Sequence, residues 1–228
     1  MGIQKLDLKK AALWMAIILV LPTLVGCTGS MGMALKASQT SVDTRTKSVA
    51  IFTLLVKNDF RQPAFGLGPS DVIVESKQSD TKSHFILEGD WQGKGPTNSL
   101  FYDDTSEAPV SLALPPGKYT IGPVMGGGAT PLLYWQFNFR VDAGFDLPPN
   151  SVVYLGHVVM SNRERKGDEE RSGPINPLLA QSLSGLNNGT MDITVTDQSS
   201  VDIPKFLAKY PCLRGVTVKT AIMTKIKE

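Results

Sequence analysis

The sequence predicts a mainly β fold, an antiparallel β-sandwich with one or two short helices. From Ser48 onward, short apolar segments rich in β-branched and aromatic residues recur along the chain. Turns that contain proline or glycine separate these segments. Helical periodicity is confined to two short stretches. About eight to ten short strands in this arrangement are typical of an antiparallel sandwich or barrel.

Five strands are expected in the first part of this region. The first, Val49–Val56, is an almost continuous apolar run, as expected for a central strand that is covered on both faces. The turn Pro115-Pro116-Gly117 predicts a hairpin with arms at 110–114 and 118–121, because proline presets φ and glycine accepts a positive φ. The two remaining strands are the short segments Asp71–Glu75 and His84–Leu87.

The clearest strand signal is an alternation of side chains at residues 134–141, which predicts one buried and one solvated face. The two faces would carry Trp135, Phe137, Phe139 and Val141, and Tyr134, Gln136, Asn138 and Arg140. Later strands are expected at 152–160, 191–196 and 216–223. One helix should begin at Asn176-Pro177, and a second should have Asp202 as its N-cap and end at Pro211. These elements predict an immunoglobulin- or prealbumin-like sandwich at 48–228, as a single domain.

The first 26 residues have the layout of a secretory signal peptide. Lysines in the first ten residues precede the apolar run Ala11–Leu21, and Leu24-Val25-Gly26-Cys27 follows. This tetrapeptide resembles the lipobox of bacterial lipoproteins, in which the cysteine is acylated and becomes the new N-terminus. A membrane-spanning helix is one alternative, but the apolar stretch Ala11–Val25 has only 15 residues, interrupted by Pro22 and Thr23, whereas a span requires ~18 to 20. The other alternative is an ordinary cleaved signal peptide, with Cys27 at the boundary by chance. The resemblance implies lipid attachment at Cys27, and Thr28 in the next position implies the outer membrane, facing the periplasm.

Processing at Cys27 changes the composition of the chain. Residues 1–26 hold three lysines and one aspartate, so the remaining 202 residues have a formal charge of zero. The remaining chain has no excess of lysine and arginine over acidic residues, so we expect no binding to nucleic acid. Cys212 would have no intramolecular disulfide partner, and it is expected to be a small buried residue. Residues 27–47 are expected to form the lipidated N-terminus and a flexible tether spanning ~25 Å, or an edge strand at the alternating Met31–Leu35.

No catalytic, metal or cofactor motif stands out. The two histidines, His84 and His157, lie in strand candidates, and a triad or zinc site built on either would need distant partners that spacing does not show. The chain lacks His-Glu-x-x-His, Cys-x-x-Cys and Gly-x-Ser-x-Gly sequences. Two glycine clusters, at 89–95 and 122–128, depart from phosphate-loop spacing and are expected to be loops, the second of which would be mobile enough to rim a binding surface.

Two regions are candidates for a partner surface. Trp91, Phe101 and Tyr102 lie in a long irregular segment, where they would either pack under the loop or form an exposed patch for a glycan or peptide. A second segment, 163–171, packs eight charges into nine residues, among them Arg163, Arg165 and Lys166. It is either a solvated loop or a surface that docks a partner by charge complementarity.

The motifs Tyr154-Leu155-Gly156-His157 and Gly189-Thr190-Met191-Asp192-Ile193, with the Leu-Pro-Pro-Gly-Lys-Tyr turn at 114–119, resemble uncharacterised Gram-negative lipoproteins over roughly residues 110–220. The resemblance implies an envelope location and a β-rich fold, and transfers no site residue. We therefore expect a non-enzymatic lipid-anchored protein that binds an envelope protein or glycan. A passive structural accessory is one alternative. The other is an envelope hydrolase that uses the acidic residues Asp90, Asp103, Asp104 or Glu107 near the 89–107 loop.

Overall fold

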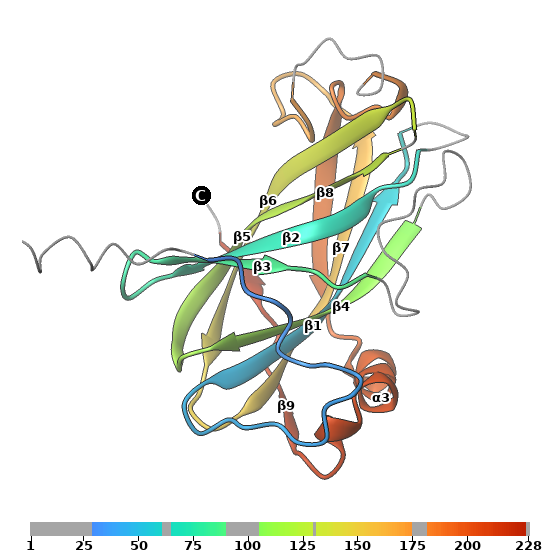
Figure 1. The fold of residues 1–228 in the computed structure, drawn as a ribbon. Coiled ribbons are helices and arrows are strands. Elements are labelled where there is room, and N and C mark those ends of the chain that lie inside the picture. The colour runs from blue at the N-terminus through green and yellow to red at the C-terminus, as the bar shows by residue number, and fades with distance from the viewer. Residues whose placement is uncertain (1–28, 61–64, 90–104, 130, 175–181, 227–228) are drawn as a thin grey trace, which may run out of the picture.

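The computed structural model describes residues 29–60, 65–89, 105–129, 131–174 and 182–226, which form two packed β-sheets (Figure 1). Sheet A has the strand order β10 (Thr224–Lys225), β6 (Tyr134–Leu147), β5 (Gly117–Ala129), β2 (Gly68–Ser76) and β3 (Lys82–Ile86). Sheet B has the order β4 (Thr105–Leu114), β1 (Ser48–Asn58), β7 (Val152–Glu164) and β8 (Gly189–Thr196), and β9 (Val218–Thr220) also pairs with β7. The predicted β-sandwich is confirmed.

Most strand pairs are antiparallel, but β7 pairs in parallel with both β1 and β9. The apolar run at 49–56 is a central strand as predicted, since β1 lies between β4 and β7. The sequence pattern does not reveal the parallel pairs, because side-chain alternation is the same in either direction.

The main core lies between the sheets and contains the apolar face of β6. Trp135, Phe137, Val141 and Phe52 are each at most 1% exposed there. A smaller core lies on the other side of sheet B, where helix α3 (Ser199–Lys209) and the 3₁₀ turn η2 (Pro211–Leu213) cover the beginnings of β1 and β7. Cys212 belongs to this second core at 3% exposure, which confirms that it is a small buried residue.

The segment before β1 is packed rather than free. Met33 and Leu35 are buried, Met31 forms a parallel bridge with Phe85 of β3, and the amide of Ala34 donates to the carbonyl of Ser111 in β4. This stretch therefore crosses from the edge of sheet A to the edge of sheet B. The expected flexible tether is wrong at 31–35, because the alternating apolar side chains point into the two cores instead of lying in water. A single bridge replaces the alternative edge strand.

Three further expectations are corrected. The glycine cluster at 122–128 is not a loop, since it lies within β5 and pairs with β2 and β6. Asp202 is not a helix N-cap, because α3 begins at Ser199 and Gln198 occupies the cap position. The strand expected at 216–223 is limited to the three residues of β9.

Several predictions concern residues outside the described ranges. Cys27 and residues 1–26 are among these, as are Trp91, Phe101 and Tyr102 and most of the helix expected at Asn176-Pro177. Within the part of the chain that the structure describes, no helix has the length and hydropathy needed to cross a membrane.

Candidate functional site

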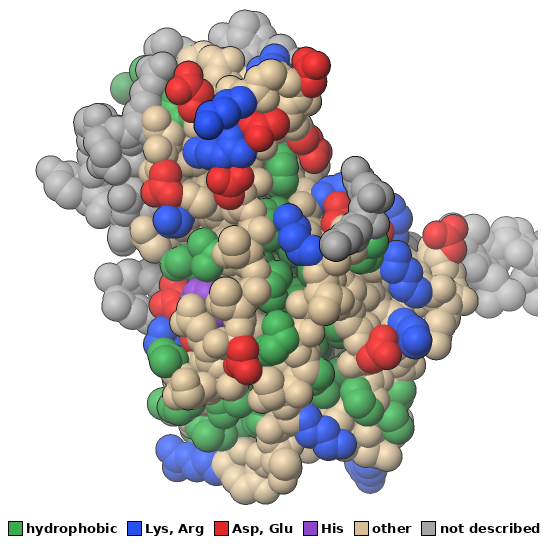
Figure 2. Space-filling model, turned by 180° about the vertical axis from the view of Figure 1, so that it is seen from behind, with side chains coloured by type: hydrophobic (Ala, Val, Ile, Leu, Met, Phe, Trp, Pro, Cys, Tyr) green, Lys and Arg blue, Asp and Glu red, His purple; other side chains and the backbone are tan. Residues whose placement is uncertain are grey.

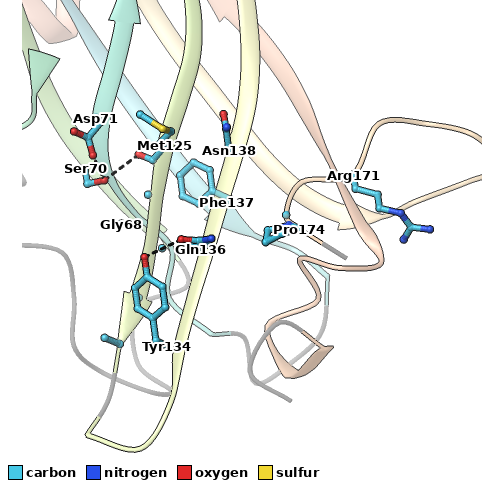
Figure 3. Close-up of a pocket in the computed structure, with 15 residues that line it drawn as sticks. Gly68, Ser70, Asp71, Met125, Tyr134, Gln136, Phe137, Asn138, Arg171 and Pro174 are labelled. Carbon is cyan, nitrogen blue, oxygen red and sulfur yellow. Dashed lines mark hydrogen bonds between the residues drawn. The ribbon is translucent and has the colours of Figure 1, made fainter. Parts of the chain in front are cut away.

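A trough of about 660 Å³ lies on the solvent-facing side of sheet A, where β2, β5 and β6 approach one another (Figure 3). Ser70, Asp71 and Met125 lie along one side of it, and Pro174 lies on the other. Arg171 also belongs to the lining, but its guanidinium points away from the trough and donates to the carbonyl of Asn187. Among the described lining residues, no basic side chain therefore points into the trough.

Three successive glycines, Gly126, Gly127 and Gly128, form the floor of the trough. None has a φ in the left-handed region, so space rather than backbone conformation requires glycine here. A Cβ on Gly128 would lie 2.5 Å from the ring of Trp135, and one on Gly126 would meet the carbonyl oxygen of Gly68. The strand can pass this close to the core side chains only without side chains of its own. The pairing register puts Gly126 and Gly128 on the inward face with Phe137 and Trp135, so on the solvent-facing side the backbone is bare at Gly127, opposite Gln136.

The polar face of β6 supplies one wall. Tyr134 is 59% exposed, and its hydroxyl donates to Oε1 of Gln136 at 3.0 Å. Asn138 is the next outward residue on this strand and also lines the trough. The exposed aromatic ring and the two amides follow from the alternation that the sequence shows at 134–141, since Trp135 and Phe137 occupy the opposite face.

A buried polar network holds the wall that contains Pro174. The Ser172 hydroxyl donates to Asn162 Oδ1 at 2.7 Å, and Asn162 Nδ2 donates to Asn58 Oδ1 at 2.8 Å. The amide of Asn138 in turn donates to the carbonyl of Ser172 at 3.2 Å, which attaches this segment to β6. Asn58, Asn162 and Ser172 are each at most 1% exposed, so the network is not weakened by competing water. The wall is thus fixed by the framework of sheet B.

A serine, a histidine and an aspartate meet beside the trough. His84 Nε2 lies 2.7 Å from Asp71 Oδ1, and His84 Nδ1 lies 3.3 Å from the hydroxyl oxygen of Ser30. A neutral imidazole protonated on Nε2 satisfies both contacts, donating to the carboxylate and accepting from the serine. The sequence identified His84 without its partners, since pairing of β2 with β3 and the packing of the N-terminal segment bring the three together.

A second polar cluster lies between α3 and sheet B. Asp202 is fully buried, and its Oδ2 accepts from the Tyr154 hydroxyl at 2.7 Å and lies 3.0 Å from His157 Nδ1. Burial, and then the neighbouring carboxylate, raise the pKa of Tyr154, which therefore remains a hydroxyl donor. Sequence reasoning placed Asp202 at a helix end and so missed this cluster. The one available signal is that Asp202 lies among Ile203, Phe206 and Tyr210, which form the apolar stripe of the helix.

The charged segment at 163–171 largely pairs with itself and its neighbours. The Arg163 guanidinium donates to both oxygens of Glu169 at 2.8 Å and to Asp192 at 2.7 Å. Arg165 donates to the carbonyl of Glu169, and the amide of Lys166 donates to the Glu169 carboxylate. On the face shown in Figure 2, acidic and basic side chains are interleaved rather than gathered by sign. Arg163 is therefore committed to intramolecular ion pairs.

The acidic residues of the alternative hydrolase prediction do not form a described site. Asp90, Asp103 and Asp104 lie outside the described residues. Glu107 lies in β4 and accepts from the Lys205 ammonium of α3 at 3.0 and 3.3 Å. The structure thus brings Glu107 towards Asp202 and His157, not towards the trough.

Comparison of the chain with protein-family models, with curated proteins and with solved structures finds no match in any of the three. The resemblance to Gram-negative lipoproteins stays a prediction.

Proposed function

We propose that this chain is a lipid-anchored protein of the cell envelope that binds a glycan in the trough of sheet A and performs no chemistry on it. The observation that carries the proposal is the trough itself, a bare glycine floor flanked by the exposed ring of Tyr134 and by the side chains of Gln136, Asn138 and Asp71. The lipid anchor rests on the signal-like N-terminus and the Leu24-Val25-Gly26-Cys27 sequence.

The chemistry of the walls suits a sugar. A pyranose has apolar C–H faces, which pack on an exposed aromatic ring, and hydroxyls around its rim, which exchange hydrogen bonds with amides and carboxylates. Tyr134 offers such a ring, while Gln136 and Asn138 offer both donors and acceptors. Gly127 matters as well, because a ligand can approach the backbone of β5 there without meeting a side chain.

A protein partner is less well supported by the described residues. Stable protein interfaces have a contiguous, largely apolar centre. The large exposed hydrophobic side chains are instead dispersed among different strands, loops and the helix: Ile86, Leu132, Tyr134, Leu183, Val201 and Ile226.

The packed N-terminal segment bears on where the glycan would be met. Ser30 contacts His84, which in turn contacts Asp71 of the trough wall. Two residues, Thr28 and Gly29, separate Cys27 from Ser30, and the three steps between consecutive Cα atoms span at most ~11 Å. A lipid on Cys27 would therefore hold this edge of sheet A close to the membrane surface, and the trough would meet glycans there.

Binding to isolated glycans tests the proposal. The full-length protein, extracted in mild detergent, would be mixed in separate arms with purified peptidoglycan sacculi and with lipopolysaccharide vesicles, and the bound fraction measured by sedimentation. We expect one arm to retain the protein and Tyr134→Ala to weaken that retention by about tenfold. A flat ligand ring that stacks on an aromatic side chain, such as a nucleobase, gains ~1–3 kcal/mol, and packing of a sugar on Tyr134 should be of this order. Leu183→Ala, which removes another exposed hydrophobic side chain, is the matched control.

Retention that is equal for wild type and Tyr134→Ala, or absent from both arms, would refute glycan binding in the trough. Photocrosslinking from position 136 that yields a single protein adduct and no glycan adduct would assign the trough to a protein partner instead.

The anchor has its own test. Cys27→Ala should abolish palmitate labelling and release the protein from the membrane fraction, whereas Cys212→Ala should leave both unchanged because Cys212 is buried in the second core. Labelling that persists in Cys27→Ala contradicts the lipid attachment.

A hydrolase is the second candidate, and the contacts of His84 with Ser30 and with Asp71 favour it. His84 has the hydrogen bonds of a general base, with a serine on one nitrogen and a carboxylate on the other. Labelling with a fluorophosphonate, which phosphonylates activated serines as the serine oxygen attacks phosphorus and displaces fluoride, distinguishes the two functions. Labelling that disappears in Ser30→Ala supports a hydrolase, and a chain that is never labelled supports simple binding.

A further inference from the structure

The cluster between α3 and sheet B is unrelated to the trough and suggests a second site. Glu107, His157 and Asp202 each offer one ligand atom, and these atoms all lie within 4.8 Å of one another. They come from three separate elements, since Glu107 lies in β4, His157 in β7 and Asp202 in α3. The fold therefore assembles the cluster from positions that are 50 and 45 residues apart in the sequence.

Asp202 has a buried carboxylate with one unsatisfied oxygen. Its side chain is completely buried, and both of its described hydrogen bonds, from Tyr154 and His157, are made by Oδ2. Oδ1 is buried and has no hydrogen-bond partner among the described residues. A buried carboxylate oxygen without a partner is costly, and such groups are usually paired with a cation or bound to a metal. The unpaired oxygen belongs to the residue that faces the two other ligand side chains.

The surroundings are those of a metal ligand set. The Tyr154 hydroxyl donates to Oδ2 and so fixes the orientation of the carboxylate, as hydrogen-bond donors to metal-bound carboxylates do. The cluster also has an entrance, because Glu107 is 28% exposed while His157 and Asp202 lie behind it. An ion can thus reach the buried ligands past Glu107.

The donor types select the class of ion. One imidazole with two carboxylates is poorly suited to Ca²⁺ or Mg²⁺, which prefer oxygen ligands alone. It suits a divalent transition-metal ion, and two carboxylates with a neutral imidazole balance its two charges. Ligand atoms around tetrahedral zinc lie ~3.3 Å apart, so separations of up to 4.8 Å require only small side-chain movements. A water molecule would complete four-coordination.

The Lys205 ammonium would compete with a metal ion for the Glu107 carboxylate. Its ammonium lies 3.0 and 3.3 Å from the two oxygens of Glu107, where it compensates the charge of the outer carboxylate. The Lys205 side chain is 41% exposed, so the ammonium can move outward into water when an ion takes its place. Removal of this charge should therefore strengthen metal binding.

We propose that Glu107, His157 and Asp202 form a binding site for a divalent transition-metal ion, with zinc the ion that fits the ligands best. The site is independent of glycan binding, and an ion there would join α3 to both β4 and β7.

Titration of the full-length, detergent-extracted protein with zinc chloride after chelator treatment tests the site, with cobalt(II) absorbance as a second readout of the ligand set. We expect one equivalent of zinc per chain. Glu107→Gln should weaken binding by at least about tenfold. Lys205→Met should strengthen it by about fivefold, the scale of a partly exposed ion pair.

Glu107→Gln is the decisive variant because it changes a rim residue and keeps the side-chain shape. His157→Gln, checked for folding by circular dichroism, should abolish binding, and His84→Gln is the matched control with a histidine–aspartate pair elsewhere. The proposal is overturned if no saturable equivalent of zinc binds, if Glu107→Gln binds zinc as tightly as wild type, or if His84→Gln is the variant that loses the ion.

Discussion

Replacement of Gly128 by alanine tests the reason for the bare floor of the trough. The new Cβ would lie 2.5 to 2.8 Å from three atoms of the Trp135 indole, which is far inside van der Waals contact. Trp135 is completely buried, its Nε1–H donates to the carbonyl of Gly66 at 3.0 Å, and Phe65 packs edge-on against its ring at 5.0 Å. The indole therefore has little freedom to move aside.

The magnitude follows from these contacts. Overpacking of a rigid core costs about 1–3 kcal/mol, and displacement of the indole would add about 1 kcal/mol for its hydrogen bond. Alanine also lowers the conformational entropy of the unfolded chain, which stabilises the folded protein by roughly 0.4–1 kcal/mol. We expect a net loss of about 2 kcal/mol in the free energy of unfolding for Gly128→Ala.

Gly144→Ala is the matched control, because Gly144 lies in the neighbouring strand β6 and its Cβ would have only ordinary contacts at 3.7 to 3.9 Å. It should be neutral or slightly stabilising. Urea unfolding followed by circular dichroism and tryptophan fluorescence gives both values. If Gly128→Ala proves as stable as Gly144→Ala, close packing is not what requires glycine in the floor.

Three further variants probe the polar framework. Tyr154→Phe removes the hydroxyl that donates to Asp202 and should lower the free energy of unfolding by about 1.5–3 kcal/mol, measured by urea denaturation; an unchanged midpoint would contradict that bond. Asn162→Ala removes two buried hydrogen bonds and should cost about 3 kcal/mol in the same assay, so a loss under about 1 kcal/mol would count against the network. Hydrogen bonds from Arg140 hold the pKa of Glu75 below its ordinary value of 4.5. Wild type should therefore be more stable than Glu75→Gln above that pH and lose this advantage as the pH falls through the lower folded pKa, whereas a difference that is independent of pH from 7 to 3 would refute the ion pair.

The sequence predicts the strands best where side chains alternate. The alternation at 134–141 identifies β6 and its inward face, because burial of one face imposes a period of two residues. The same reasoning fails at Gly126–Gly128, since a strand residue without a side chain has no such period. The prediction of a tether at Met31–Leu35 is also wrong. The surrounding residues are mostly small and polar, but this short segment packs into both cores.

The candidate sites were largely beyond prediction because distant residues form them. Asp202 has a sequence context typical of a helix start, but its partners Tyr154 and His157 lie 48 and 45 residues away. A local capping preference of about 1 kcal/mol is outweighed when a buried hydroxyl and imidazole need an acceptor. The trough likewise depends on a loop segment, which includes Pro174, that only the tertiary structure brings against β6.

The parallel pair in the middle of sheet B has a consequence for when the chain can fold. Val56 of β1 pairs with Met160 of β7, which is 104 residues later. β7 in turn pairs with β9, at Val218–Thr220. A chain made from its N-terminus therefore cannot close this sheet until almost all of it has emerged. Such long-range pairing slows folding and leaves β1 exposed meanwhile. If the signal-like N-terminus directs export to the envelope, as proposed here, this delay favours a chain that is still unfolded when transport begins.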